Sequence, residues 1–596
     1  MTSKWWCADF ETTSLKNLEE DGYVRVWLWS LVGVDENEKL HGFTMETFLQ
    51  TVKKLKPKVV FFHNLKFDGK FIVDYFSRNG FEYGNHYDVI IDGLGSWYEI
   101  KWHTDKRHTT KFWDSLKKFP GTSVKQLGKF VGLPKLDAPY FDKYYPSDYK
   151  PTQEEIDYCI RDSEVVARAI KIDLEQGFTS MTLATDCFKW GKETCLNGRF
   201  YRDFMPLLPK PIHDFAHKTF RGGVTFLNPE YEDVEVHDVK VFDVNSLYPW
   251  VMHDCPLPVG YGVFVPEEPK DDLFMVRFKC QFYVKHNGFP FLQLKNSPRY
   301  SSNEFVRFSE GEEELYMTSV DYKNFKKNYK IIDEHDHTYL KFNSQVGLMA
   351  PHVDYWMQKK KEYEAQGLPF MRYIAKTMMN GFYGKTALRT ARQNVVPYLD
   401  SKTGCMCYSN KVETEVEPIY VPYGAFTTAW ARDKLINSAL KVWKDFIYCD
   451  TDSIHCFDSD NIPLDIHQTE LGKWKDETLD GAYEYARYIK QKTYCHARPG
   501  IDSTGKKYKE VVEIRAAGLN VASRTGIAFD EFKYGLTVKN ANFKMATVPG
   551  GAILKPCDWV MNKDPFDVII EYMNNMKEET EDERRSRHKR NAEGVL

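Results

Sequence analysis

Two groups of acidic residues interrupt the most apolar segments of this 596-residue chain. Asp9 and Glu11 lie at the end of the strand-like segment 4–10, and Asp450 and Asp452 separate two further strand-like segments. Carboxylates beside an apolar core lose hydration and repel one another, so they persist there only where cations neutralise them. The pattern therefore predicts a fold with two separate cation-binding sites.

The length of the chain exceeds what one hydrophobic core organises, and about 150 residues per domain predicts roughly four domain-sized units. The first part alternates strand-like segments at 4–10, 59–63 and 97–102 with helix-like ones, the last at 153–170. This alternation is typical of an α/β domain with a mixed sheet. The loop-rich segment 197–211 follows, so we place the main domain boundary near residue 190.

The first acidic group comes from three separated segments. Asp9 and Glu11 share one face of a strand, Asp68 follows the buried strand at 59–63, and Tyr158 and Asp162 share one helix face. Two hard divalent ions about 4 Å apart are the usual way to hold four such acids, and they hydrolyse phosphodiesters. Alone, an Asp-x-Glu pair is more often a solvated edge. Together the three segments resemble the exonuclease motifs of proofreading DNA polymerases, in which Tyr158 orients the attacking water.

The second acidic group has two parts. The segment 243–249, Asp-Val-Asn-Ser-Leu-Tyr-Pro, resembles motif A of family B DNA polymerases. The resemblance implies that Asp243 binds both metals, that Val244 contributes its carbonyl, and that Tyr248 stacks beneath the incoming sugar and excludes a 2'-hydroxyl. The turn with Asp450 and Asp452 resembles motif C, although an exposed Asp-rich turn is the plain alternative.

A cationic face is expected between these parts. Arg372, Lys376, Asn380, Tyr383 and Gly384 fall on one face of a single helix that begins at a proline. The segment resembles motif B, which implies that Lys376 contacts the nucleotide triphosphate and that Asn380 and Tyr383 border the nascent base pair.

Other short matches add contacts. Lys360 is a candidate for a second triphosphate contact, with Lys359 and Lys361 left open as alternatives. The segment 492–494 resembles the Lys-x-Tyr motif at the primer terminus, and 428–432 resembles a template-contacting motif; each match is weak alone. They imply DNA contacts by Thr428, Arg432, Lys492 and Tyr494.

Two long insertions, 281–350 and 386–424, separate the motifs. With Phe-Arg-Gly-Gly at 220–223 and Asp-Ser-Leu-Lys-Lys at 114–118, they make the chain similar to protein-primed family B DNA polymerases of small tailed bacteriophages, over about residues 5–555. The resemblance implies a multi-domain α/β and α+β fold: an RNase H-like 3'–5' exonuclease domain over 1–190, then a right-hand polymerase domain over 191–596. Its fingers would lie at about 351–385, the motif C part of the palm at 425–495, and the thumb with a terminal helix and tail at 496–596.

The subgroup implies further roles. The first insertion helps to bind a terminal protein that primes synthesis, and the second is a hairpin that encircles DNA, giving processive, strand-displacing replication of a linear phage genome. In the exonuclease, Lys135 assists catalysis and Asp137 lies near a metal. The implied DNA contacts are Thr12, His63, Asn64, Phe67, Ser115, Leu116, Arg221, Gly222 and Gly223. Phe220 departs from the family, which has Tyr there, so a hydrogen bond from that hydroxyl is lost.

The expected cofactors are two divalent cations per active site, Mg²⁺ with Mn²⁺ as the alternative. The expected partners are primer-template DNA, single-stranded DNA, deoxynucleoside triphosphates and a terminal protein, for a chain that is a monomer or a heterodimer with that protein. No segment approaches about 18 apolar residues, so we expect no membrane span. The scattered cysteines fit the reducing cytoplasm of an infected bacterial host.

Other function classes are weaker. A net charge of −4 does not by itself indicate a DNA-binding protein. A nucleic-acid-primed family B polymerase is the first alternative, because protein priming depends on the insertions alone. A standalone 3'–5' exonuclease would leave the second acidic group and Lys376 without use, and a reverse transcriptase would lack the proofreading half.

Overall fold

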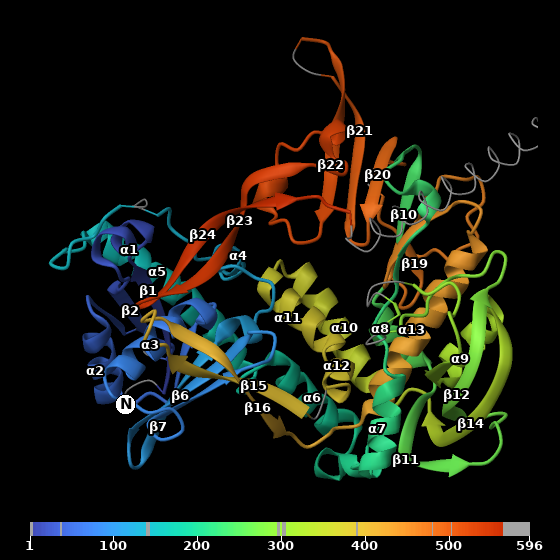
Figure 1. Ribbon diagram of the computed structural model, residues 1–596, viewed down its shortest axis with the longest axis horizontal. Coiled ribbons are helices and arrows are strands. Elements are labelled where there is room, and N and C mark those ends of the chain that lie inside the picture. Colours follow the sequence, from blue (N-terminus) through green and yellow to red (C-terminus); the bar gives the residue numbers. More distant parts are fainter. Residues whose placement is uncertain are drawn as a thin grey trace, which may run out of the picture.

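The computed structural model describes residues 4–35, 38–138, 143–294, 299–300, 305–388, 391–478, 481–501 and 504–563. The terminal helix and tail expected after residue 563 lie outside these residues. Within these residues, six sheets and their helices form several packed units (Figure 1).

The N-terminal module is a mixed sheet between helices, as the alternating pattern predicts. Its strand order is β3-β2-β1-β4-β7-β6-β5, and β1, β4 and β7 run parallel. Helix α5 packs on β1 and β2, whereas α2 and α3 cover the other face. The elements are β1 Trp5–Thr12, α1 Leu15–Asp21, β2 Val26–Gly33, β3 Lys39–Gly42, α2 Met45–Leu55, β4 Val59–Phe62, α3 Leu65–Arg78, β5 Tyr87–Ile91, β6 Trp97–Asp105, β7 His108–Asp114, α4 Val124–Phe130 and α5 Gln153–Glu175.

The predicted boundary near residue 190 falls inside α6, Leu183–Cys195. This helix packs on α10 Ala350–Ala365, α11 Pro369–Asn380 and α12 Phe382–Thr386, which form a helical layer with it. Because α6 belongs to that layer by its contacts, we propose the division in the turn between α5 and α6.

The central sheet carries the second acidic group. Its order is β19-β10-β18-β17-β8, and α13 packs against it. The turn between β17 and β18 is the acidic turn of the sequence. The elements of this unit are α7 Lys210–Thr219, β8 Thr225–Leu227, β10 Val239–Val244, α8 Leu247–Asp254, α13 Val421–Lys441, β17 Phe446–Asp450, β18 Ser453–Phe457 and β19 Trp474–Asp476.

The single helix expected from 369 to 384 is wrong, because the helix breaks at Gly381 into α11 and α12. The carbonyl of Met378, which would accept from the amide four residues later, instead faces Cys187 Sγ at 2.9 Å and His352 Nε2 at 2.9 Å. A Cβ at Gly381 would also lie 3.3 Å from the Cys187 sulfur. Side chains from two other helices thus compete for the hydrogen bond that would continue α11.

The segment expected as the first insertion belongs to a larger unit. The strand order β11-β14-β12-β13 shows that the sheet begins at β11, before residue 281, and α9 packs on it. Its elements are β11 Leu257–Val265, β12 Leu273–Val284, β13 Glu313–Thr318, α9 Ser319–Asn328 and β14 Tyr329–Gln345. We call this unit the insertion sheet.

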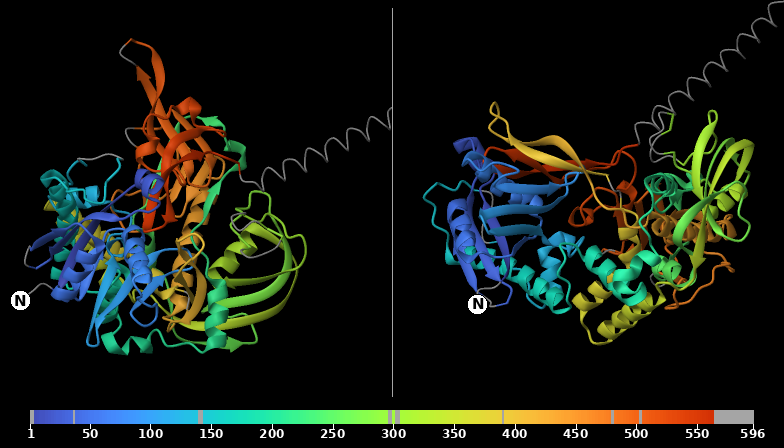
Figure 2. Two further views of the ribbon diagram at one scale, coloured as in Figure 1. Left: turned by 60° about the vertical axis from the view of Figure 1, so that its left-hand side comes forward. Right: turned by 90° about the horizontal axis from the view of Figure 1, so that it is seen from below.

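Two long hairpins reach back to the N-terminal module (Figures 1 and 2). The second insertion forms β15 Ala391–Leu399 and β16 Met406–Glu415, and both strands contact α3. The C-terminal hairpin, β23 Thr537–Val548 and β24 Gly551–Val560, also contacts α3. It follows a sheet of order β22-β21-β20-β9, with β9 Glu235–Val236, β20 Tyr485–Lys490, β21 Thr493–Ile501 and β22 Lys507–Ala516. The hairpins therefore complete a ring of contacting units, which consists of the N-terminal module, the helical layer, the central sheet, the sheet β22-β21-β20-β9 and the hairpins themselves.

A buried cation joins the N-terminal module to α6. Lys118 Nζ lies 2.7 Å from Asp173 Oδ2 and 2.6 Å from Asp186 Oδ2, and it donates to the carbonyl of Phe178 at 2.7 Å. The Lys118 side chain is 1% exposed. Burial raises the pKa of Asp173 to about 6. One lysine therefore neutralises two carboxylates from α5 and α6.

We predict that Lys118→Met lowers the free energy of unfolding by about 3–5 kcal/mol, because it leaves two buried carboxylates without a cation. Urea unfolding followed by tryptophan fluorescence measures the change. The control is Lys117→Met on the same turn, where the ammonium lies 4.4 Å from the Tyr98 ring centroid and a loss of at most about 1 kcal/mol is expected. Equal stabilities of the two variants would contradict the role of Lys118.

Candidate active sites

The first acidic group assembles at the junction of β1, α3 and α5. Asp9 and Glu11 lie on the face of β1 that also carries Cys7, whose core includes α5 residues. Asp68 is in the first turn of α3, and Asp162 is on α5. Both of these carboxylates are buried. The structure therefore brings together the four acids that the sequence selects.

Their proximity is evident in their electrostatics. Burial raises the pKa of Asp9 well above its ordinary value, and Glu11, Asp162 and Asp68 raise it further, whereas Lys135 lowers it. Burial also raises the pKa of Asp68, with a further contribution from Glu11. Such a set of mutually repelling carboxylates is stable in its ionised form only beside cations.

Lys135 supplies one of these cations. Its ammonium donates to Asp162 Oδ2 and lies 4.7 Å from the Tyr158 ring centroid. Burial lowers the pKa of Lys135, but the Asp162 carboxylate outweighs burial and raises it. Lys135 therefore stays charged between Asp162 and Tyr158. Asp137 is exposed, and a metal-binding role for it stays a prediction.

The group also offers ligand atoms that a divalent cation would accept. Asp162 Oδ1 is buried without a hydrogen-bond partner in the described part of the chain. Ligand atoms of Asp9, Glu11 and Cys159 lie within 4.8 Å of one another. Sequence analysis missed Cys159, which precedes Ile160 on α5 and gives no motif signal. Its thiol contacts the Asp9 carbonyl at 3.7 Å, and burial raises its pKa, so the oxygen donors suit a hard cation better than the sulfur.

The expected single-strand contacts lie beside this group, but not all face solvent. Ser115 is fully buried and its hydroxyl is 2.9 Å from His63 Nδ1, while His63 Nε2 is 2.9 Å from the Thr122 carbonyl. Burial lowers the pKa of His63 to about 4. Ser115 is therefore placed to orient His63 rather than to touch DNA. Asn64 is exposed, and Thr12, Phe67 and Leu116 are partly exposed.

The second acidic group lies on adjacent strands of the central sheet. Asp243 on β10 pairs with Ser453 on β18, next to Asp452. The amide of Val244 donates to the Asp452 carbonyl at 2.8 Å, which fixes motif A against the acidic turn. Thr451 occupies the turn at φ 57°, an unusual conformation for a β-branched residue, and its amide donates to the Val224 carbonyl at 2.7 Å.

Lys376 lies near both Asp243 and Asp452. Burial raises the pKa of Asp243 to about 7, with Asp452 and Glu477 adding to the shift and Lys376 opposing it. Burial also raises the pKa of Asp452, again opposed by Lys376. These two carboxylates are the part of the group without a close ion pair among the described residues, which fits a pair of divalent cations.

Asp450 has a different environment. Lys492 Nζ lies 2.7 Å and 2.6 Å from its two carboxylate oxygens, and the Thr225 hydroxyl donates to Oδ1 at 2.8 Å. Asp450 is thus already neutralised by Lys492. Asp452 has no such ion pair among the described residues, so a metal-binding role for Asp452 stays a prediction.

Aromatic rings lie on both sides of the second group. Tyr248 and Tyr383 stack with ring centroids 4.4 Å apart. Asn380 donates from its side chain to the Lys376 carbonyl at 2.8 Å. Tyr494 packs 5.0 Å from His455, between β18 and β21. The three tyrosines lie near the acidic turn, since Asp450 or Asp452 adds to the rise that burial causes in their pKa values.

The structure distinguishes among the three neighbouring lysines. Lys359 Nζ pairs with Glu362 at 2.8 Å, and Lys361 is exposed. Burial lowers the pKa of Lys360, and Arg372 and Lys376 lower it further. Lys360 is therefore the lysine of the three that lies close to Arg372 and Lys376.

Two residues next to Asp243 were missed. Lys475 pairs with Asp243 across β10 and β19, and Glu477 follows directly after β19. Strand β19 has only three residues, too short for a detectable alternation. Their place beside the group arises from sheet pairing alone.

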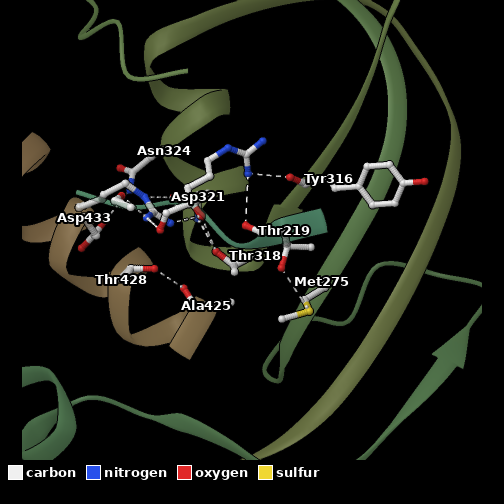
Figure 3. Close-up of polar contacts among 12 residues, drawn as sticks. Thr219, Met275, Tyr316, Thr318, Asp321, Asn324, Ala425, Thr428 and Asp433 are labelled. Carbon is white, nitrogen blue, oxygen red and sulfur yellow. Dashed lines mark hydrogen bonds and ion pairs between the residues drawn. The ribbon is translucent and has the colours of Figure 1, made fainter. Parts of the chain in front are cut away.

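The residues expected to contact DNA at the domain junction are largely turned inward. Thr428 and Arg432 on α13 are buried, and Thr428 Oγ1 donates to the carbonyl of Ala425 at 3.0 Å (Figure 3). Burial lowers the pKa of Arg221 to about 10. Gly222 and Gly223 are exposed. Of these residues, the two glycines are the most accessible, and Arg221 is partly exposed.

Within the described residues, no helix combines the length and apolar character needed to cross a membrane.

Known proteins are similar to this chain in sequence and in fold. The sequence profile described as "DNA polymerase type B, organellar and viral" matches residues 134–470. The DNA polymerase of Bacillus phage Nf is 33% identical, covering 93% of this chain and 99% of that protein. The DNA polymerase of Bacillus phage phi29 is 32% identical, covering 93% of this chain and 98% of that protein. A solved structure of phi29 DNA polymerase with primer-template DNA and incoming nucleotide has a TM-score of 0.84 and 29% identity, covering 94% of this chain and 100% of that one.

The raised pKa of Asp243 predicts pH-dependent cation binding at the second group. Below a pKa of about 7 Asp243 binds a proton, and a neutral carboxyl is a poor ligand. We expect the dissociation constant for Mn²⁺ to rise about tenfold between pH 8 and pH 6. Calorimetric titration of an Asp9→Ala/Asp68→Ala chain isolates this site. A constant affinity over that range would show that Asp243 does not bind the ion.

Proposed function

The chain belongs to the type B DNA polymerases of organelles and viruses, and on that premise we propose that it copies a DNA template at Asp243 and Asp452 and edits 3' ends at the first acidic group. The fold expected from the sequence, an RNase H-like exonuclease domain followed by a right-hand polymerase domain, is confirmed by the similarity to phi29 DNA polymerase over nearly the whole chain. The observation that supports both activities is the presence of two separate acidic groups whose carboxyl pKa values are raised.

At the synthesis site, Asp243, Asp452 and the Val244 carbonyl would hold two divalent cations, for which Mg²⁺ is our first choice and Mn²⁺ the second. When bound, these ions supply charge neutralisation and activation of the attacking hydroxyl. Lys376 and Lys360 contact the triphosphate. Lys376 lies near Asp243, because it opposes the rise in the pKa of that carboxyl group, and Lys360 lies near Lys376, because Lys376 lowers its pKa. Positioning and electrostatics then account for phosphoryl transfer.

The primer end lies against Lys492 and Tyr494. Asp450 holds the Lys492 ammonium through both of its oxygens. A lysine fixed in this way can meet a primer phosphate without losing the entropy of a free side chain. Tyr248, stacked on Tyr383, lies under the incoming sugar and leaves no room for a 2'-hydroxyl.

At the editing site, Asp9, Glu11, Asp68 and Asp162 would hold the second pair of cations. Lys135 keeps Tyr158 and Asp162 in one arrangement and stays protonated. Tyr158 can then orient the attacking water towards the terminal phosphodiester. His63, Asn64, Phe67, Thr12 and Leu116 line the approach for a single-stranded end, where aromatic stacking does not depend on sequence.

Separate loss of the two activities tests this assignment. We expect Asp452→Ala to lose primer extension by at least about a hundredfold while it still degrades the primer, because several kcal/mol of charge stabilisation disappear. The Asp9→Ala/Asp68→Ala double variant should extend and no longer degrade. A labelled primer on a template, with Mg²⁺ and with or without deoxynucleotides, measures both. Degradation without extension by the wild-type chain would favour a standalone exonuclease.

Protein priming is the finer part of the proposal. Exposed apolar side chains on the insertion sheet support a protein partner there, since Tyr261 is 61% and Val263 60% exposed on β11. We propose a terminal protein as this partner, in a heterodimer formed in the cytoplasm of an infected bacterial host. A covalent adduct between the first nucleotide and that protein would separate this mode from nucleic-acid priming.

Processive synthesis is supported by the closed ring. Pro549 accepts from the amide of Val24 at 2.9 Å, so the C-terminal hairpin is bonded to the N-terminal module. Asp74 on α3 accepts from the amide of Gly550 at 3.2 Å and from Arg78 Nε at 2.6 Å. Arg78 in turn donates to the Gly404 carbonyl of the β15–β16 hairpin. One carboxylate therefore links α3 to both hairpins.

We predict that Asp74→Asn shortens the product made per binding event about tenfold, because a hydrogen bond to a charged group contributes roughly 1.5–3 kcal/mol. Primer extension in the presence of a DNA trap measures this length, and single-nucleotide insertion should be unchanged. The control is Asp105→Asn, whose partner Lys56 lies in an exposed pair at 2.7 Å. Equal product lengths for both variants would contradict ring closure by Asp74.

A further inference from the structure

A buried ion pair connects the insertion sheet to the glycine loop at the domain junction. We propose that Asp321 is a positioning residue for DNA binding, because it orients Arg432 so that Arg432 holds the loop 221–223 beside the synthesis site. The inference depends on the proposed synthesis function and assigns a role to a residue outside all the motifs.

The ion pair has a fixed geometry. Arg432 Nε donates to Asp321 Oδ1 at 2.9 Å, and Nη2 donates to Oδ2 at 2.7 Å. Asp321 is 0% and Arg432 2% exposed. Asp321 also accepts from the Thr318 hydroxyl, the N-cap of α9, at 2.9 Å. A two-point contact of this kind fixes the plane of the guanidinium group as well as its position.

The remaining side of the guanidinium group holds the loop. Arg432 Nη1 donates to the carbonyls of Arg221 at 2.6 Å and Gly222 at 2.7 Å. On the other side of the loop, a Cβ at Gly223 would lie 2.6 Å from Thr451 Oγ1. The loop is therefore held between Arg432 and the acidic turn that carries the metal-binding carboxylate.

The Arg221 side chain adds a second link to the insertion sheet. Its Nη1 donates to the carbonyl of Tyr316 on β13 at 2.6 Å. Figure 3 shows Tyr316 of β13 and Asp321 of α9 among the residues that make these polar contacts. Arg221 thus joins the loop to the insertion sheet directly. Arg432 joins them indirectly, through its bonds to the loop carbonyls and to Asp321.

This arrangement leaves the amide side of the loop for a ligand. Gly222 and Gly223 are exposed, and within the described chain their amides donate no hydrogen bond. With the carbonyls of Arg221 and Gly222 bound inward, the amides can meet the oxygens of a DNA phosphate. If Arg432 loses its orientation, the carbonyls are free to rotate towards the phosphate and repel it.

The structure offers a matched control. Asn324 on α9 donates to Asp433 Oδ1 on α13 at 3.0 Å, as Figure 3 shows, and this bond joins the same two helices as the ion pair. Asp433 has no contact with the loop among the bonds of the described residues. Asp321→Asn and Asp433→Asn therefore make the same chemical change at the same interface, and only the first reaches the loop.

We expect Asp321→Asn to raise the dissociation constant for primer-template DNA at least tenfold, and Asp433→Asn to change it less than twofold. At saturating DNA the rate of nucleotide insertion should stay within twofold of the wild-type rate in both. Degradation of a free single-stranded oligonucleotide should also be unchanged, because the loop is absent from that site. Fluorescence anisotropy and single-turnover extension measure these quantities.

A second variant separates positioning from stability. A buried ion pair can often be replaced by apolar residues of similar size without loss of stability. In Asp321→Leu/Arg432→Met we expect the melting temperature to recover relative to Asp321→Asn, while DNA binding stays at least tenfold weaker than wild type. Recovery of DNA affinity together with stability would overturn the inference, as would wild-type affinity in Asp321→Asn. Failure of the wild-type chain to extend a primer would instead overturn the proposed function.

Discussion

Buried carboxylates repel one another, and the need to neutralise them is the physical constraint on which the rest of this structure depends. Each acidic group collects side chains from separate segments, and burial raises the pKa values of Asp9, Asp68 and Asp243. A protein that only needed stability would replace such groups by apolar residues. Their presence at two places, each next to a lysine, indicates binding sites in which metal cations neutralise the carboxylates and the lysines pair with substrate phosphates.

Buried or partly buried cations determine what each group can do. Lys135 holds one oxygen of Asp162 and leaves the other for a metal ion, whereas Lys492 holds both oxygens of Asp450 and leaves Asp243 and Asp452 for the metal ions of that group. Lys118 and Arg432 play the same physical part away from the sites, where they join units of the fold. A single cation with several fixed acceptors specifies an arrangement more strictly than apolar packing does, because its geometry is directional.

Elements that carry the two sites also contact the hairpins and the glycine loop. The helix α3 carries Asp68 of the editing site near its start and Asp74 of the ring contact two turns later. The hairpins that close the ring therefore dock on an element of the editing site, while the glycine loop touches the acidic turn of the synthesis site. DNA held by the ring would remain within reach of both sites.

Local periodicity was enough to predict the alternating elements of the N-terminal module and the faces that its candidate acids share, whereas the acids themselves were selected by the resemblance of their segments to known motifs. Strand alternation places Asp9 and Glu11 on one face, and helix spacing places Tyr158 and Asp162 together, because these relations depend only on the backbone repeat. The break at Gly381, the choice of Lys360 over its neighbours, the pairing of Lys492 with Asp450 and the inward turn of Arg432 depend on residues far away in the chain. The sequence by itself thus determined which residues are the candidates for the chemistry and which of them share a face. Only the tertiary structure decided which of them are neutralised, buried or free, because those outcomes are set by long-range contacts that no local repeat encodes.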